Sequence, residues 1–142
     1  MLGELELTQG KYKKKGKVAL LDMDNPRFLK ATIRDNIILG EIYNGKKLKL
    51  VCKEVGLNLN KYPGRDLTEI VEGQRNLTGY DQRKILLARL LYMEPDIVMI
   101  NKYFDRESKD KQKELYDSVV NGFLKDKTVI YTSNINLIVK QG

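Results

Sequence analysis

The stretch RNLTGYDQRKILLARLLYMEPDIVMINKYFD, residues 75–105, decides the fold class of this chain. Its apolar run from Ile85 through Leu91 is nearly continuous, which predicts a deeply buried helix. After a short loop, the run DIVMIN (96–101) predicts a strand that is buried on both faces. That strand ends on Asn101 and Lys102, so its carboxyl end carries an amide and an ammonium group in place of carboxylates.

Two further apolar runs, KVALLD (17–22) and KTVIYTS (127–133), also predict buried strands. All three runs are rich in Val and Ile and do not alternate with polar residues, a pattern typical of parallel sheets covered by helices. Helical segments separate the strands, as the crossovers of a parallel sheet require. The chain of 142 residues is therefore expected to form one α/β layered domain.

The helical segments carry their own start signals. TIRDNIILG (32–40) pairs Thr32 with Asp35, and the 75–105 stretch pairs Thr78 with Asp81, both at capping-box spacing. A third helix is predicted from an apolar face made of Leu48, Val51, Cys52 and Val55. A fourth is predicted after residue 108, with apolar side chains spaced four apart at Leu115, Val119 and Phe123.

Composition excludes several kinds of function. The chain has one cysteine and no histidine, so a Cys/His zinc site and every histidine-dependent catalytic triad are excluded. Cys52 lies on an apolar helical face and is expected to be a buried thiol. No apolar run reaches the ~18 residues of a membrane span, and the first residues lack the apolar core of a signal peptide, so direct membrane insertion is not expected.

The net charge of +7 raises the possibility of an anionic partner. Lysines cluster at 13–15 and again at 46–49. A nucleic-acid or membrane surface would suit such clusters, but no aromatic–basic motif accompanies them. We therefore favour a solvated lysine-rich surface and expect no nucleic-acid partner.

Residues 76–101 resemble the signature segment and the following Walker B strand of an ATP-binding cassette (ABC) nucleotide-binding domain. Other segments resemble the same domain in the same order. These are a Q-loop-like region at 18–31, a helical region at 32–92 with a signature-like motif at 77–81, a Walker B-like strand at 96–102 and an H-loop-like strand at 127–134. The opening residues are similar to the C subfamily, which includes the multidrug-resistance-associated transporters and the cystic fibrosis conductance regulator.

The resemblance implies a partial P-loop NTPase-like layered fold over residues 1–142, with an ABC cassette core plus a helical signature region. The P-loop pattern G-x-x-x-x-G-K-[ST] does not occur in the sequence. We therefore expect a truncated domain without the Walker A strand and helix, and without the family's strands after the H-loop. Apolar surface on the first two strands is expected to be uncovered as a result.

The signature-like residues are Leu77, Thr78, Gly79, Tyr80 and Asp81. In the family this segment faces the γ-phosphate of ATP held by a partner domain. Tyr80 replaces a glycine, and Asp81 brings a negative charge that would repel phosphate if it were desolvated. The alternative that we favour is a helix cap formed by Thr78 and Asp81.

The other positions that the family uses for chemistry are also altered. Asn101 and Lys102 align with the Walker B acidic pair, so a relic strand end is expected and neither a magnesium site nor a general base. Lys102 would compensate phosphate charge or reach solvent. Asn134 aligns with the H-loop histidine, and Ser108 with the D-loop aspartate. The Q-loop glutamine falls at Met23 or Asp24, and Asp24 is expected to be a solvated loop carboxylate.

The resemblance implies ATP and Mg²⁺ as family cofactors, although none is expected for this chain alone. We predict a degenerate, non-hydrolysing fragment that acts as a scaffold or as the non-catalytic half of an ATP-driven transporter. Its implied partners are a transmembrane domain and a second nucleotide-binding domain, at the cytosolic face of a membrane. A repurposed protein-interaction module is the alternative, and a basic nucleic-acid binder ranks third.

Overall fold

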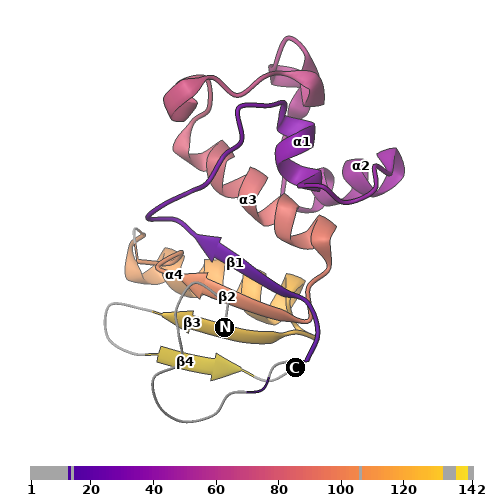
Figure 1. Cartoon of the computed structure of the whole chain (residues 1–142). Coiled ribbons are helices and arrows are strands. Elements are labelled where there is room, and N and C mark those ends of the chain that lie inside the picture. The colour runs from indigo at the N-terminus through magenta and orange to yellow at the C-terminus, as the bar shows by residue number, and fades with distance from the viewer. Residues whose placement is uncertain (1–12, 14, 106, 133–136, 141–142) are drawn as a thin grey trace, which may run out of the picture.

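A computed structural model describes residues 13, 15–105, 107–132 and 137–140 of the chain. A four-stranded sheet forms its base, with helices packed above it (Figure 1). In spatial order the strands are β1 (Val18–Asp22), β2 (Ile97–Asn101), β3 (Thr128–Thr132) and β4 (Leu137–Lys140). The first three are parallel to one another, as the sequence predicts, so the α/β class is confirmed.

Strand β4 was not expected. The prediction that no strand follows the H-loop-like segment is wrong, because β4 pairs antiparallel with β3 from Thr132↔Leu137 to Val129↔Lys140. The residues Leu137–Lys140 form only a four-residue run, and so short a run carries little periodic signal. Its pairing satisfies the backbone groups of β3 that would otherwise form a free sheet edge.

Four helices and several short turns connect the strands. The helices are α1 (Ile33–Ile38), α2 (Gly45–Glu54), α3 (Gly79–Met93) and α4 (Lys109–Tyr116). Three 3₁₀ turns lie between α2 and α3, at Leu59–Lys61, Arg65–Leu67 and Glu72–Gln74. Helices α1, α2 and α3 form a group beyond β1, whereas α4 lies along the sheet (Figure 1).

Helix α4 continues directly into a π-helix, η4 (Asp117–Phe123). The sequence predicts one continuous α-helix here, with apolar residues four apart. In the structure the amide of Leu124 donates to the carbonyl of Val119, five residues earlier, at 2.9 Å. This wider turn buries both Val119 and Val120. π-Helices are rare and often occur at functional sites.

The predicted caps are confirmed. Thr32 and Asp35 form a complete capping box at α1, each side chain accepting from the other residue's backbone amide. Thr78 caps α3 by accepting from the amide of Asp81 at 3.1 Å. The sequence therefore fixes the N-termini of both helices locally.

The core lies between the helices and one face of the sheet. Side chains on that face are buried: Ala19, Leu21, Val98, Ile100 and Val129. The opposite face is less covered, and Leu20 on β1 is 46% exposed. The predicted uncovered apolar surface is thus present on the first strand.

Cys52 is buried on the apolar face of α2, as predicted. Burial raises the pKa of its thiol to about 11, so the thiolate is scarce at neutral pH. Within the described residues, no helix is long and apolar enough to cross a membrane.

Candidate functional site

The carboxyl ends of the three parallel strands bring together residues that are far apart in the sequence. Asp22, Asn101 and Thr132 are register partners on adjacent strands. The Asn101 amide group donates to Asp22 Oδ1 at 3.1 Å, and the Thr132 hydroxyl donates to Asn101 Oδ1 at 2.7 Å. The Asn101 side chain therefore bridges its two neighbouring strands.

Lys102 follows this row at the end of β2. Its φ of 50° lies in the left-handed region, which is uncommon for a lysine. Its ammonium group lies 2.8 Å from Asp24 Oδ2. The hydrogen bond and charge of Asp24, with smaller effects of Asp105 and Asp22, raise the pKa of Lys102 above its usual value.

This ion pair adds a contact that the sequence did not predict. Lys102 was expected to compensate phosphate or to reach solvent, and Asp24 to be a solvated loop carboxylate. Both are about half exposed and bind each other. The sequence could not show this contact, because it depends on β1 and β2 being parallel neighbours.

The donors at this strand edge do not fit Mg²⁺. One oxygen of Asp22 accepts from the Asn101 side chain and from the amide of Asp24, at 3.1 and 3.0 Å. The carboxylate of Asp24 is paired with an ammonium group, whose charge repels a divalent cation. No group of three or more His, Cys, Asp or Glu side chains suited to a metal occurs in the part of the chain that the structure describes.

The signature-like segment is built around a buried carboxylate. Asp81 is 2% exposed and accepts hydrogen bonds from the hydroxyls of Tyr62 at 2.8 Å and Thr78 at 2.7 Å. Lys61 forms an ion pair with the same oxygen. Burial alone would raise the pKa of Asp81, but the hydrogen bonds from Lys61, Thr78 and Tyr62 lower it below its ordinary value.

Asp81 therefore points into the protein. This geometry favours the helix-cap interpretation, since the charge expected to face phosphate is paired internally. Leu77 is buried beside it, whereas Tyr80 is 67% exposed. Burial raises the pKa of the Tyr62 hydroxyl, and the hydrogen bond to Asp81 raises it further.

The structure does bring the Q-loop-like and signature-like residues together. Met23 and Asp24 line one hollow of about 360 Å³ with Gly79 and Tyr80. Met23 is buried at 5% exposure. Of the remaining predicted positions, Ser108 is the N-cap residue of α4 without a side-chain capping bond, and Asn134 lies outside the described residues.

Three basic residues of α3 anchor the helix. Arg83 forms an ion pair with Glu107, and the ammonium of Lys84 donates to the carbonyl of Gly56 at 2.6 Å. Arg89 donates to the backbone carbonyls of Asn36 at 2.6 Å and Arg27 at 3.0 Å. Burial lowers the pKa of Arg89 to about 10.

The importance of the contact between Arg89 and Asn36 was missed by sequence reasoning. Asn36 is fully buried, and its side chain also binds both backbone groups of Leu29 at 2.8 and 3.1 Å. The pair thereby joins α1, α3 and the loop after β1. A charged residue inside the apolar run 85–91 was the available signal, because a buried arginine needs fixed acceptors.

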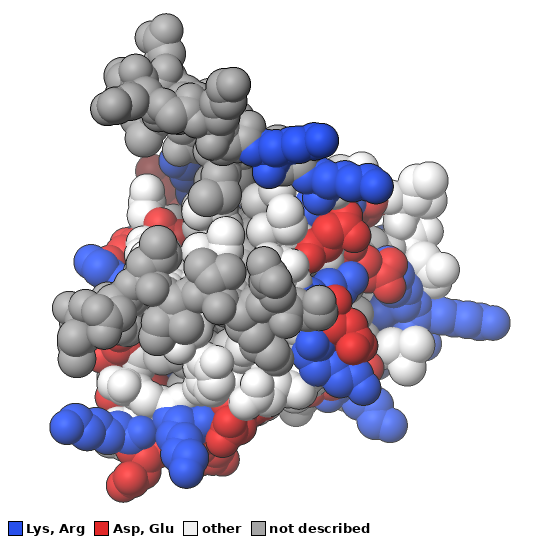
Figure 2. All heavy atoms as spheres, turned by 90° about the horizontal axis from the view of Figure 1, so that it is seen from below, with Lys and Arg blue, Asp and Glu red and all other residues white. Residues whose placement is uncertain are grey.

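Basic and acidic side chains are intermingled around the face shown in Figure 2. Several of the lysines have acidic partners on the surface. Lys17 pairs with Glu41, and Lys47 lies 2.8 Å from Glu94. This arrangement supports the interpretation of a mixed, solvated surface.

Comparison with known proteins shows which class of protein the chain resembles. No protein-family model matches the chain. Curated relatives do match and are transporters of the ATP-binding cassette class. The putative ABC transporter C family member 15 of Arabidopsis thaliana is 34% identical over 136 residues, which cover 94% of this chain and 13% of the relative.

Two animal proteins match over the same region. ATP-binding cassette sub-family C member 2 of Rattus norvegicus is 33% identical over 138 residues, and the cystic fibrosis transmembrane conductance regulator of Danio rerio is 30% identical over 136 residues. Each match covers 94% of this chain and 9% of the relative. The chain is thus similar to a segment of C-family ABC transporters and spans about a tenth of the length of the relatives it matches.

Proposed function

We propose that this chain is a nucleotide-binding-domain segment that does not hydrolyse ATP and that serves as a scaffold or as the non-catalytic half of an ABC transporter. The observation that carries the proposal is the ion pair between Lys102 and Asp24, beside the Asn101 bridge. Together these contacts occupy Asp24, Asn101 and one oxygen of Asp22 at the strand edge where the family's chemistry would require free carboxylates.

The first requirement that fails is metal binding. Mg²⁺ in phosphate-handling sites is held by one or two carboxylates with water and phosphate oxygens. Asn101 offers an amide oxygen that already accepts from Thr132 at 2.7 Å. Asp24 could bind a cation only after losing Lys102, which is held at 2.8 Å.

The second requirement is a general base. A base must be unprotonated at the working pH and within hydrogen-bond reach of the attacking water. The carboxylates around Lys102 raise its pKa, so its ammonium form is maintained at neutral pH. Lys102 cannot accept a proton in that form.

The third element is the N-terminus of α3, which in the family faces phosphate. Helix N-termini attract anions through free amides and the helix dipole. Here Thr78 already accepts from the amide of Asp81, so this amide is not available to a phosphate. The Asp81 carboxylate is paired with Lys61 inside the protein. Both contacts support a structural role for the segment.

The surface for a transmembrane partner is proposed on the helical region. Three residues of the loop and helix after β1 make internal contacts: the Arg27 carbonyl accepts from Arg89 at 3.0 Å, Phe28 lies under the Arg89 guanidinium at 5.6 Å, and Arg34 binds Asp66 at 2.7 Å. Large apolar residues nearby are more accessible, namely Leu29 at 50%, Leu39 at 37%, Ile42 at 91% and Tyr43 at 51% exposure. Exposed apolar side chains of this kind suit a protein partner.

The same apolar residues support the second candidate, a protein-interaction module unconnected with transport. Affinity capture with the chain would separate the two. Recovery of a chain with membrane-spanning segments, lost on Ile42→Lys, supports the transporter proposal. Recovery only of partners without such segments supports the module.

Loss of hydrolysis is tested by phosphate release from millimolar Mg²⁺–ATP. The chain is expected to give no turnover above a blank without protein, and Asn101→Ala is expected to match it. Turnover in the wild type that Asn101→Ala abolishes would contradict the proposal, because it would locate a working centre at this strand edge.

A further inference from the structure

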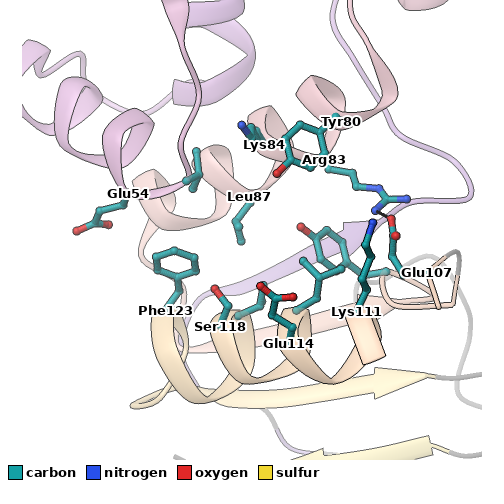
Figure 3. Close-up of a pocket in the computed structure, with 14 residues that line it drawn as sticks. Glu54, Tyr80, Arg83, Lys84, Leu87, Glu107, Lys111, Glu114, Ser118 and Phe123 are labelled. Atoms are coloured by element: carbon teal, nitrogen blue, oxygen red, sulfur yellow. Dashed lines mark hydrogen bonds and ion pairs between the residues drawn. The ribbon is translucent and has the colours of Figure 1, made fainter. Parts of the chain in front are cut away.

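A second cavity, of about 450 Å³, lies between α3, the end of α2 and the α4–η4 helix (Figure 3). Its volume falls in the range of small-molecule sites, roughly 300–1,000 Å³. It shares Tyr80, Arg83 and Glu107 with the smaller hollow described above but extends away from the strand edge. Of the altered family positions named above, Tyr80 alone lines it.

The cavity has an apolar floor. Leu87 comes from α3, and Val119 and Phe123 come from the π-helix η4. The wide turn of η4 is therefore part of the cavity wall, and such turns are common at functional sites. Figure 3 shows the Leu87 side chain and the Phe123 ring on opposite walls, from α3 and η4. An apolar group of moderate size would bury this surface.

One polar side chain that lines the cavity makes no hydrogen bond to the described residues. Tyr103 is 4% exposed and lines the cavity. Among the described residues its hydroxyl has no hydrogen-bond partner. Burial is the main effect that raises the pKa of Tyr103, to about 12, so the hydroxyl stays protonated and available as a donor. This hydroxyl can therefore donate to a ligand that brings an acceptor into the cavity.

The charges are unevenly distributed. Arg83, Glu107 and Lys111 gather at one end of the cavity, whereas Glu54 lies at the other (Figure 3). Arg83 and Glu107 neutralise each other in an ion pair. Lys111 has no ion-pair partner within the described part of the chain, so this end carries a net positive charge. Glu114, on the same helix as Lys111, also lines the cavity, and its negative charge offsets positive charge in the middle of the cavity.

We propose that this cavity binds a small apolar molecule with one carboxylate, whose oxygens accept from the Tyr103 hydroxyl and pair with Lys111 while its apolar body covers Leu87, Val119 and Phe123. The ligand class follows from an unpartnered donor and an unpaired cation above an apolar floor. The site does not depend on nucleotide, so it stands or falls separately from the function proposed above.

The test uses the full chain and three probes of one shape: 3-phenylpropanoate, its primary amide and 3-phenylpropylamine. Calorimetry is expected to give a Kd of about 1 mM or tighter for the carboxylate. The amide is expected to bind at least about tenfold more weakly, and the amine, which Glu54 and Glu114 would favour, not measurably. Equal or tighter binding of the amide or the amine, or no binding of any probe, would overturn the proposal.

Variants locate the binding. Tyr103→Phe removes only the hydroxyl and is expected to weaken binding of 3-phenylpropanoate about tenfold to hundredfold. Lys111→Gln is expected to weaken it about twofold to fivefold, as for an exposed ion pair. Ser118→Trp, at the exposed rim, is expected to fill the cavity and abolish binding, whereas Lys125→Gln, outside the cavity, should change nothing.

Unfolding midpoints identify any variant that does not fold. If Tyr103→Phe fails to fold, Lys111→Gln and Ser118→Trp still decide the site, because both residues are exposed. Unchanged affinity in Ser118→Trp would place the ligand elsewhere and contradict the proposal. Equal loss in Lys125→Gln would do the same, since it would show that binding follows overall charge.

Discussion

The Thr132 hydroxyl donates to the carboxamide oxygen of Asn101 at 2.7 Å, across two neighbouring parallel strands. The amide nitrogen of the same side chain donates to Asp22 on the third strand at 3.1 Å. One side chain therefore satisfies a donor on one side and an acceptor on the other. An aspartate could accept from Thr132 but could not donate to Asp22.

This relationship predicts the effect of Asn101→Asp on stability. Two carboxylates would then face each other at the strand ends, and the free energy of unfolding at pH 7 is expected to fall by about 1–2 kcal/mol. The loss should shrink near pH 4, where one carboxyl of the pair becomes protonated. Urea unfolding at the two pH values measures this. Asn60→Asp, an exposed change without a described side-chain contact, is the matched control; a loss as large there would contradict the explanation.

Asp81 gives a second prediction, with a defined pH dependence. Its folded-state pKa lies below the ordinary value, since hydrogen bonds from Lys61, Thr78 and Tyr62 outweigh burial. Its stabilising contribution is therefore present above the unfolded-state pKa and is lost as pH falls through the folded-state pKa. Asp81→Asn should cost about 1.5–3 kcal/mol at pH 7 and progressively less below pH 4.

Chemical denaturation across pH 3–8 measures this effect, with Asp126→Asn, an exposed substitution, as the control. A cost that does not change with pH would mean that the carboxylate charge is not what stabilises the first turn of α3.

Arg89 is predicted to hold the loop after β1 in place. Its guanidinium binds the carbonyls of Arg27 and Asn36 through a fork that lysine cannot reproduce. Arg89→Lys is expected to destabilise the fold by about 1–3 kcal/mol and to speed amide hydrogen exchange around residues 27–38. Arg65→Lys, on an exposed turn, should leave exchange there unchanged. If the amides of residues 27–38 exchange equally slowly in Arg89→Lys and in the wild type, Arg89 does not hold this loop in place.

Cys52 is predicted to be unreactive in the native state. Burial keeps the thiol protonated, with a pKa of about 11, and hides it behind the α2 face. Labelling by a thiol reagent at pH 8 should be at least about a hundredfold slower than in urea, following the fraction of unfolded chain. Rapid labelling under native conditions would show that α2 opens locally or packs differently.

Local signals in the sequence predict most of the fold. Thr32, Thr78 and the apolar runs determine helix starts and buried strands through contacts within a few residues, so the pattern alone is sufficient. The π-helix η4 was not predictable in this way, because its register is set by burying both Val119 and Val120 against the sheet. Strand β4 is too short to give a periodic signal.

The site was predicted only in part. The resemblance to the family predicts that Asn101, Lys102 and Asp81 are altered positions, but it does not show what they bind. Their partners Thr132, Asp24 and Lys61 come from other elements and become neighbours only after folding. The place of Tyr103 in the cavity likewise follows from packing, since a tyrosine after a strand gives no signal of its position in the sequence.

The central claim is that Lys102 and Asn101 saturate the strand edge that would otherwise hold a divalent cation. Mn²⁺ titration followed by electron paramagnetic resonance tests it most directly, with the wild-type chain compared with Asn101→Asp/Lys102→Glu. The double variant is expected to bind one Mn²⁺ with a Kd at or below about 1 mM, as for clustered carboxylates, and the wild type is expected to bind at least tenfold more weakly. Equal binding by the two proteins would contradict the account.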